Sequence, residues 1–169
     1  MQIGLLSDTH GYLDERILEH FKDCDEIWHA GDFGTEKVSL LLSKFKKLRG
    51  VYGNVDGTDV RKTHPVELSF ECEGVKVLIT HIGGYPGNYS PSASKKIHEV
   101  KPSLFISGHS HILKVMPDKK NNLLHMNPGA AGVHGFHKFR TMLRFSINNG
   151  KIEGLEVIEL GLRGAIPLP

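Results

Sequence analysis

The sequence predicts an α/β protein of 169 residues that forms one domain with two sheets. Over the first 52 residues, apolar runs alternate with segments of helical periodicity, and this β-α-β-α-β order is typical of a parallel sheet with right-handed crossovers. The rest of the chain has several apolar runs and few helical segments, which predicts a second sheet of mixed or antiparallel strands. We expect a single core domain over residues 1–160 and a loosely held tail over residues 161–169.

The first half supplies three strands and two helices. An apolar run over residues 1–6 predicts a buried strand, and further short strands are expected at residues 26–29 and 48–52. Apolar side chains at helical spacing predict one helix over residues 13–21. The same spacing predicts a second helix that begins near Thr35 and ends before Gly50.

The second half begins with a predicted hairpin of residues 66–72 and 75–80. Its first strand alternates apolar and polar residues, which places Cys72 on the inner face as a buried thiol. Ser90-Pro91 opens a helix that Lys101-Pro102 closes. Further strands, the last two joined by a turn at Asn148-Asn149-Gly150, are expected at residues 104–107, 112–116, 123–126, 141–147 and 152–160.

The composition counts against several classes of function. A formal net charge of +2 gives no electrostatic case for binding nucleic acid or an anionic membrane. Because no stretch of about 18 apolar residues occurs, we expect no membrane span. The first residues lack the basic region of a signal peptide, and the two cysteines lack metal-type spacing. These features predict a protein of the reducing cytoplasm.

The 11 histidines are an unusual number, and several of them lie in turns that directly follow predicted strands. Five such turns carry carboxylate, amide or imidazole groups and no thiolate, a donor set that suits Mn, Fe, Zn or Ni. Each turn alone has a simpler explanation, such as a capping Asp or a core histidine, but the five in this order indicate a metal site. They are Ser7-Asp8-Thr9-His10, Ala30-Gly31-Asp32-Phe33, Gly53-Asn54-Val55-Asp56, Thr80-His81-Ile82-Gly83 and Ser107-Gly108-His109-Ser110-His111.

This series of motifs closely resembles that of the calcineurin-like metallophosphoesterases, and within them the small prokaryotic phosphodiesterases of the YfcE type, which are related to the retromer subunit Vps29. The resemblance implies a four-layer α/β/β/α sandwich of two mixed sheets, with a dinuclear metal centre at the carboxyl ends of the strands. It also implies two ligand sets that share Asp32 as a bridge. One ion would be held by Asp8, His10, Asp32 and His111, and the other by Asp32, Asn54, His81 and His109.

The resemblance implies hydrolysis of small organic phosphate esters, most of all diesters, by attack of a metal-bridging hydroxide on phosphorus. Asp32, Asn54 and His81 are expected to act in catalysis as well as in metal binding, with manganese as the first choice of ion. A shared carboxylate is reasonable, because two cations about 3.5–4 Å apart need an anion between them. Gly31 and Gly53 would allow the tight turns that aim the following side chains. From the family we also expect a homodimer or higher oligomer.

One position departs from the family pattern. The residue after the Asn is commonly a His that assists the leaving group, but here it is Val55, which cannot donate a proton. We therefore expect aryl or otherwise activated esters to be cleaved better than alkyl esters. His134 or His137, in a glycine-rich segment, would serve as a substitute acid unless that segment is simply a surface loop.

Several other polar residues remain open between two interpretations. Asp56 would either orient a metal ligand or lie exposed in its turn. Tyr85 and Tyr89 would either stack on a substrate ring or pack within their own loop. Four histidines fit no ligand motif and are expected to be structural or exposed: His20, His64, His98 and His125.

Two other functions deserve comparison with the enzyme. A scaffold without turnover, like Vps29, would be expected to show substitutions among the ligands, and none is replaced here. A nuclease would be expected to carry a basic stripe with interleaved aromatic residues, which this chain lacks. A small phosphate ester is therefore the expected substrate, with neither nucleic acid nor a membrane as partner.

Overall fold

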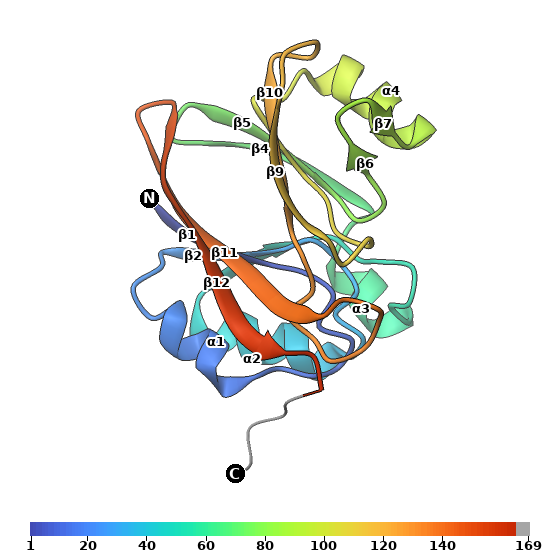
Figure 1. Ribbon diagram of the computed structural model, residues 1–169, viewed down its shortest axis with the longest axis vertical. Coiled ribbons are helices and arrows are strands. Elements are labelled where there is room, and N and C mark those ends of the chain that lie inside the picture. Colours follow the sequence, from blue (N-terminus) through green and yellow to red (C-terminus); the bar gives the residue numbers. More distant parts are fainter. Residues whose placement is uncertain (165–169) are drawn as a thin grey trace.

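The computed structural model describes residues 1–164, which form two five-stranded sheets packed face to face with helices outside them (Figure 1). Residues 165–169, most of the predicted tail, lie outside the described part of the chain. The predicted four-layer α/β/β/α sandwich of two mixed sheets is confirmed. No helix in the described part is long and apolar enough to cross a bilayer.

The first sheet has the strand order β12-β11-β1-β2-β3. Its parallel half is the predicted one, with β1 (Gln2–Leu6), β2 (Glu26–His29) and β3 (Lys47–Gly50) side by side. The other half comes from the far end of the chain, where β11 (Phe139–Asn148) pairs antiparallel with β1 and β12 (Lys151–Leu162) pairs with β11. This hairpin lies in the first sheet, so not every strand of the second half belongs to the second sheet.

Three helices follow the strands of the parallel half: α1 (Glu15–His20), α2 (Glu36–Phe45) and α3 (Thr58–Thr63). Asp14 begins α1 by accepting a hydrogen bond from the backbone N–H of Arg16. The apolar residues Ile17 and Leu42 pack with Phe21 against the outer face of the first sheet. The sequence did not predict α3, because its six residues are too few to show a helical period.

The second sheet has the order β4-β5-β8-β10-β9 and mixes parallel with antiparallel pairs. Helix α4 (Pro91–Val100) covers its outer face, capped by the hydroxyl of Ser90 at the predicted start. A short hairpin of β6 (Gly84–Tyr85) and β7 (Asn88–Tyr89) precedes this helix. The strands of the second sheet are β4 (Glu67–Cys72), β5 (Val75–Thr80), β8 (Leu104–Ile106), β9 (Leu113–Asp118) and β10 (Leu123–Pro128).

The main core lies between the two sheets. Residues such as Leu5 and Trp28 from the first sheet meet Ile79 and Ile106 from the second, all of them fully buried. Cys72 is 5% exposed in this core, which confirms the predicted buried thiol. Several predicted boundaries differ from the observed ones by one or two residues. Val66 precedes β4 and is exposed rather than inward, and β12 continues two residues into the predicted tail, to Leu162.

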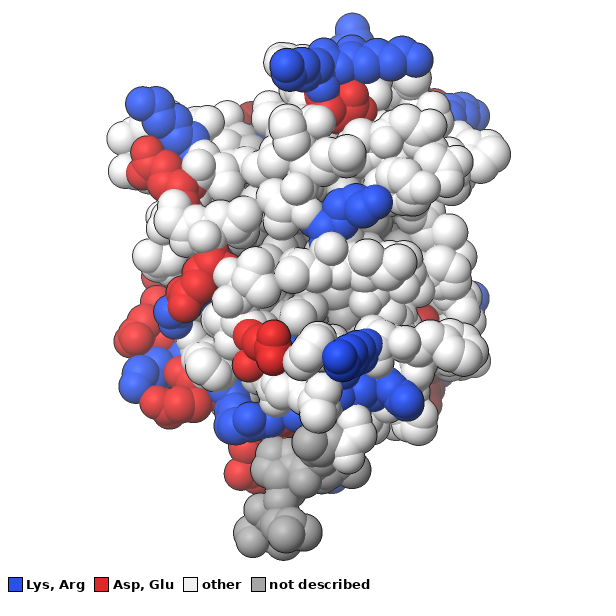
Figure 2. Space-filling view, viewed as in Figure 1, with Lys and Arg blue, Asp and Glu red and all other residues white. Residues whose placement is uncertain are grey.

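Charged side chains lie interspersed on the surface. On the face shown in Figure 2, Lys and Arg alternate with Asp and Glu toward the margins, and much of the middle is uncharged. One carboxylate, Glu26, is almost fully buried and accepts hydrogen bonds from Arg49 and from the indole of Trp28. Lys47 completes the cluster with an ion pair of 2.6 Å. Burial alone would raise the pKa of Glu26, but these hydrogen bonds lower the pKa to about 2.

We predict that Glu26→Gln lowers the free energy of unfolding by about 2 kcal/mol at pH 7, because it breaks a charge-assisted network. The folded-state pKa lies below the ordinary value of 4.5, so this stabilisation is present above pH 4.5 and is lost as the pH falls toward 2. Urea unfolding at pH 7, 4 and 2.5 measures the effect. Glu153→Gln, at an exposed glutamate of β12, is the control, and an equal difference from wild type at all three pH values would contradict the prediction.

Candidate metal centre

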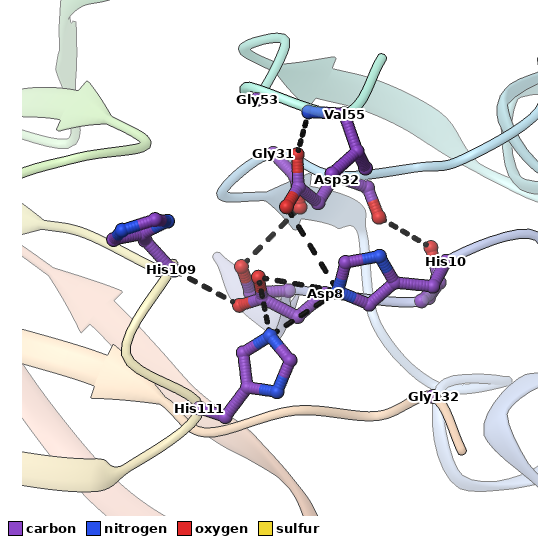
Figure 3. A network of polar contacts seen from close by, with 12 residues as sticks. Asp8, His10, Gly31, Asp32, Gly53, Val55, His109, His111 and Gly132 are labelled. Carbon is purple, nitrogen blue, oxygen red and sulfur yellow. Dashed lines mark hydrogen bonds and ion pairs between the residues drawn. The ribbon is translucent and has the colours of Figure 1, made fainter. Parts of the chain in front are cut away.

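Polar side chains gather where strands of both sheets end. Asp8 and Asp32 follow β1 and β2 of the first sheet, and His81 follows β5 of the second. Figure 3 shows Asp8 at the middle of this network, with His111 on one side of it and Asp32 on another. The structure therefore brings together residues that lie up to about one hundred positions apart in the sequence.

A first group of ligand atoms comes from Asp8, His10 and His111. The Nε2 atoms of His10 and His111 lie 3.1 Å apart, and that of His111 lies 3.3 Å from Oδ1 of Asp8. The corresponding distance from His10 to Asp8 is 3.9 Å. All three atoms are within 4.8 Å of one another, which is close enough for one cation to contact all of them.

A second group consists of Asp8, Asp32 and His81. Oδ2 of Asp32 lies 3.2 Å from Nε2 of His81 and 3.8 Å from Nε2 of His10, so this carboxylate faces both groups, as its predicted bridging role requires. Asn54 adds its Oδ1 at 3.1 Å from Nε2 of His81. The N–H at Nδ1 of His81 donates to the carbonyl of Ala30, so Nε2 is the atom that would bind an ion, in exchange for any proton it carries.

His109 is placed differently from the other predicted ligands. Its backbone N–H donates to Oδ2 of Asp8, and its exposed ring stands edge-on to that of His81 with 5.2 Å between the ring centres. The ring lines the same cavity as His10 and Asn54, but it is not part of either ligand group formed by the described residues. Ligation by His109 therefore stays a prediction.

The side chain of Asp8 tests whether a metal fits here. It is fully buried, and its Oδ1 has no hydrogen-bond partner among the described residues. A buried carboxylate oxygen without a donor is costly, and a cation in contact with it would remove that cost. The surrounding oxygen and imidazole donors suit a hard or borderline divalent ion. The residues present thus fit the predicted metal.

Backbone strain is concentrated in these turns. Nine non-glycine residues of the described part have positive φ, and five of them are predicted ligands. This conformation costs an ordinary residue about 1 kcal/mol or more, and it recurs where function fixes a side chain's direction. The five are Asp8 (φ 55°), His10 (47°), Asp32 (58°), His109 (67°) and His111 (58°).

Two glycines leave room for this geometry. Gly31 has φ 98°, and a Cβ there would lie 2.5 Å from Nδ1 of His81. A Cβ on Gly53 would overlap the carboxylate of Asp32. Both positions therefore need glycine mainly because ligand side chains approach the backbone so closely.

Asp56 holds the turns of two ligands in place. Its buried carboxylate accepts hydrogen bonds from the backbone N–H groups of Phe33, Gly34 and Gly53, at 3.2, 2.7 and 2.8 Å. Asp56 therefore ties the turn that carries Asp32 to the turn that carries Asn54. Of the two interpretations left open by the sequence, the structure favours orientation of ligands over an exposed turn carboxylate.

The electrostatics of the second group favour a charged pair. Burial opposes ionisation of both Asp32 and His81, yet their mutual hydrogen bond and charge lower the pKa of Asp32 and raise that of His81. In the first group burial dominates and lowers the pKa of His10, which keeps this imidazole neutral near pH 7. A neutral imidazole is the form that binds metal.

The segment 132–137 lies against the site and is not a remote surface loop. Nδ1 of His137 is 3.2 Å from Nδ1 of His111, and Nε2 of His137 is 3.1 Å from the carbonyl of Gly132. His134 stands edge-on to His10, with 6.2 Å between ring centres. The segment is at the surface, with His134 and Phe136 exposed, as one of the two alternatives expected, and it also places His137 behind a predicted ligand.

Sequence reasoning missed the part played by His29. This fully buried residue accepts a hydrogen bond from the backbone N–H of Gly31 at Nδ1, and its Nε2 lies 3.1 Å from the hydroxyl of Thr9. It thus links the turns after β1 and β2. A polar residue directly before the turn of Ala30, Gly31 and Asp32 was the available signal.

The tyrosines and histidines to which the sequence assigned no ligand role can now be placed in the fold. Tyr89 donates its hydroxyl to Asp118 of β9 and packs on Phe105 of β8, so its contacts are with the second sheet rather than within its own loop. Tyr85 is exposed, with the ammonium group of Lys114 over its ring. His64 and His125 are buried and hydrogen-bonded to serines, His98 is exposed and His20 is partly buried, as expected.

Comparisons with known proteins agree with this geometry. Residues 1–150 match the model of the calcineurin-like phosphoesterase superfamily domain. A probable metallophosphoesterase from Methanothermobacter thermautotrophicus is 29% identical over 140 residues, covering 79% of this chain and 78% of that protein. Among solved structures, an archaeal phosphodiesterase superimposes with a TM-score of 0.74 at 23% identity, over 95% of this chain and all of the other. Vps29 from Entamoeba histolytica superimposes with a TM-score of 0.72 at 14% identity, over 95% and 100% of the two chains.

The two structural neighbours share the fold at low sequence identity, whereas the family match rests on the sequence itself. It confirms the resemblance that the five turn motifs indicated. Covering most of the chain and all of the predicted ligands, the match shows that this protein belongs to the calcineurin-like phosphoesterase superfamily, whose members use divalent metal ions.

Proposed function

We propose that this protein is a phosphodiesterase that hydrolyses small organic phosphate esters with two divalent ions, of which manganese is the first to test. The observation that carries the proposal is the unpartnered buried oxygen of Asp8, at the junction of two groups of ligand atoms. The relatives named metallophosphoesterase and phosphodiesterase support the same reaction class.

The chain's own residues would divide the work as follows. When bound, two divalent ions supply a water of lowered pKa and neutralise charge on the phosphoryl oxygens. Asp8 and Asp32 would hold the ions at the right separation, because each carboxylate faces both groups of ligand atoms. Asn54 directs its Oδ1 toward His81, and the N–H groups on its Nδ2 have no acceptor among the described residues. They would donate to a phosphoryl oxygen.

His137 would fix the proton of His111. The carbonyl of Gly132 can only accept, so Nε2 of His137 must carry a proton. Burial lowers the pKa of His137, so its ring is neutral near pH 7 and Nδ1 is an acceptor for the N–H at Nδ1 of His111. Nε2 of His111 is then unprotonated and faces Asp8, ready to bind an ion.

A scaffold without turnover is the alternative that the likeness to Vps29 keeps in view. Against it stands the complete set of seven predicted ligands, all retained in this chain. The clustering of six of them at contact distances, with strained backbone at four of those six, also favours a working site.

We predict that chelator-stripped protein hydrolyses bis(p-nitrophenyl) phosphate only after a divalent ion such as Mn²⁺ is added. Asp32→Ala should lower kcat/KM by more than about 100-fold, because it removes a carboxylate of the second group that also faces His10 of the first. Release of p-nitrophenol is the measurement. Asp59→Ala, at an exposed aspartate of α3 that pairs with Lys62, is the matched control and should leave the rate unchanged. Folded wild-type protein without turnover with Mn²⁺, Fe²⁺, Zn²⁺ or Ni²⁺ would favour the scaffold instead.

We predict that His137→Leu weakens Mn²⁺ binding about 10- to 100-fold, because His111 loses the acceptor that fixes its proton. His137→Asn, which restores an acceptor near the Nδ1 position, should recover most of the affinity. Calorimetric titration of Mn²⁺ measures this without reference to turnover. His134→Leu, in the same segment, is the control, and equal losses in the Leu and Asn variants would contradict the proposed role.

We predict that the leaving group controls the rate of hydrolysis. Val55 is 50% exposed and lines the cavity that holds His10 and Asp32, so no proton donor stands at this position. Among aryl and alkyl diesters, kcat should therefore fall steeply as the pKa of the leaving alcohol rises. Val55→His should flatten this dependence, whereas Ile112→His, at another exposed apolar residue of the same cavity, should not. A flat dependence in the wild type would contradict the expectation.

A further inference from the structure

Two cavities of similar size meet at Asn54. One has a volume of about 370 Å³ and is also bordered by His81. The other, of about 410 Å³, contains the groups of His10, Asp32 and His111. Because Asn54 lies in both walls, a phosphoryl group bound at the ligand atoms would stand at the boundary between them.

The first cavity, which we call the Val66 cavity, has a largely apolar wall. Tyr52, Val66, Ile82 and Ala93 line it, and they come from segments on both sheets and from α4. Val66 and Ile82 are 57% and 47% exposed, although each is a large aliphatic side chain next to a polar site. Exposed apolar side chains in a concave site are the usual wall for an apolar part of a ligand.

Arg61 gives this cavity one oriented cation. Its guanidinium lies over the ring of Tyr52, 4.6 Å from the ring centre, and donates to the backbone carbonyls of Asp56 and Asn54. No carboxylate of the described residues forms an ion pair with it. Glu67, the acidic residue in the wall, is paired with Lys96. The cavity is thus apolar with a positive edge, which suits a flat ring on an anionic ester.

The second cavity also has an apolar rim on the far side of the ligand atoms. Val55, Ile112 and Phe136 line it, and Ile112 is 60% exposed. A phosphate monoester has one organic group and would leave one of the two cavities filled with water. A diester has two organic groups on a tetrahedral phosphorus, and these leave the phosphorus in different directions.

We propose that the preferred substrates are phosphodiesters with two bulky organic groups, and that the Val66 cavity binds one of them, a flat aromatic ring such as an aryl group or a nucleobase. This rests on the proposed function and adds the substrate class to it. The Val66 cavity then discriminates diesters by size and shape, while the ligand atoms bind the phosphoryl group that all esters share.

The test compares two inhibitors that differ only in the size of their organic groups. Diphenyl phosphate and dimethyl phosphate both present a phosphodiester anion, and their inhibition constants against bis(p-nitrophenyl) phosphate are measured with Mn²⁺-loaded protein. In Val66→Trp, which fills the cavity, the inhibition constant of diphenyl phosphate should rise at least 10-fold. The constant of dimethyl phosphate should change less than two-fold. In Val66→Ser, which removes apolar surface without adding bulk, the inhibition constant of diphenyl phosphate should rise by a smaller factor.

Val157→Trp is the matched control, because Val157 is a valine of β12 with a similar exposure of 50%. It should change neither constant, and thermal unfolding of each variant checks that the fold is kept. Equal changes for the two inhibitors in folded Val66→Trp, or no change for either, would overturn the proposal. Absence of turnover in the wild type would instead overturn the proposed function, so the two failures are distinguishable.

Discussion

The buried carboxylate of Asp8 is the constraint around which the centre is arranged. A fully buried charge is tolerated only with compensating partners, and the described residues satisfy one of its oxygens through the backbone of His109 and leave the other bare. The bare oxygen faces His111 at 3.3 Å, and the other predicted ligands surround the same space. A cation in this space would contact the bare oxygen, which is why the residues around Asp8 fit a metal.

The turns around Asp8 show how that charge is held. Left-handed backbone at the ligands is costly, so it needs support from rigid neighbours. The strands before each turn are buried in the core, and Asp56 and His29 hydrogen-bond the turns to one another. The direction of the metal-ligand side chains is thus set by hydrogen bonds from the backbone of their turns to Asp56 and His29, two buried residues behind the site.

Much of this could be predicted from the sequence because the ligands lie in turns directly after strands. Apolar runs ending in Asp8, Asp32 and His81 predicted both the strands and the meeting of their ends. What could not be predicted depends on tertiary contact. The pairing of β11 with β1, the place of His137 behind His111 and the exposure of Val66 involve residues far apart in sequence, and helix α3 is too short for a periodic pattern. The sequence left Asp56 open between two roles, because two of its three backbone donors belong to the distant turn at Phe33 and Gly34.

The origin of the ligands in two different sheets has a thermodynamic consequence. Asp8 and Asp32 follow strands of the first sheet, while His81 and His111 follow strands of the second, so the ligand atoms converge only when the two layers are packed together. An ion bound there would contact residues of both layers at once. The binding free energy of the ion then adds to the stability of the packed layers. The gain is about 2.7 kcal/mol when the free ion is at 100 times its dissociation constant. The concentration of free metal ion would in this way affect the stability of the folded chain as well as its chemistry.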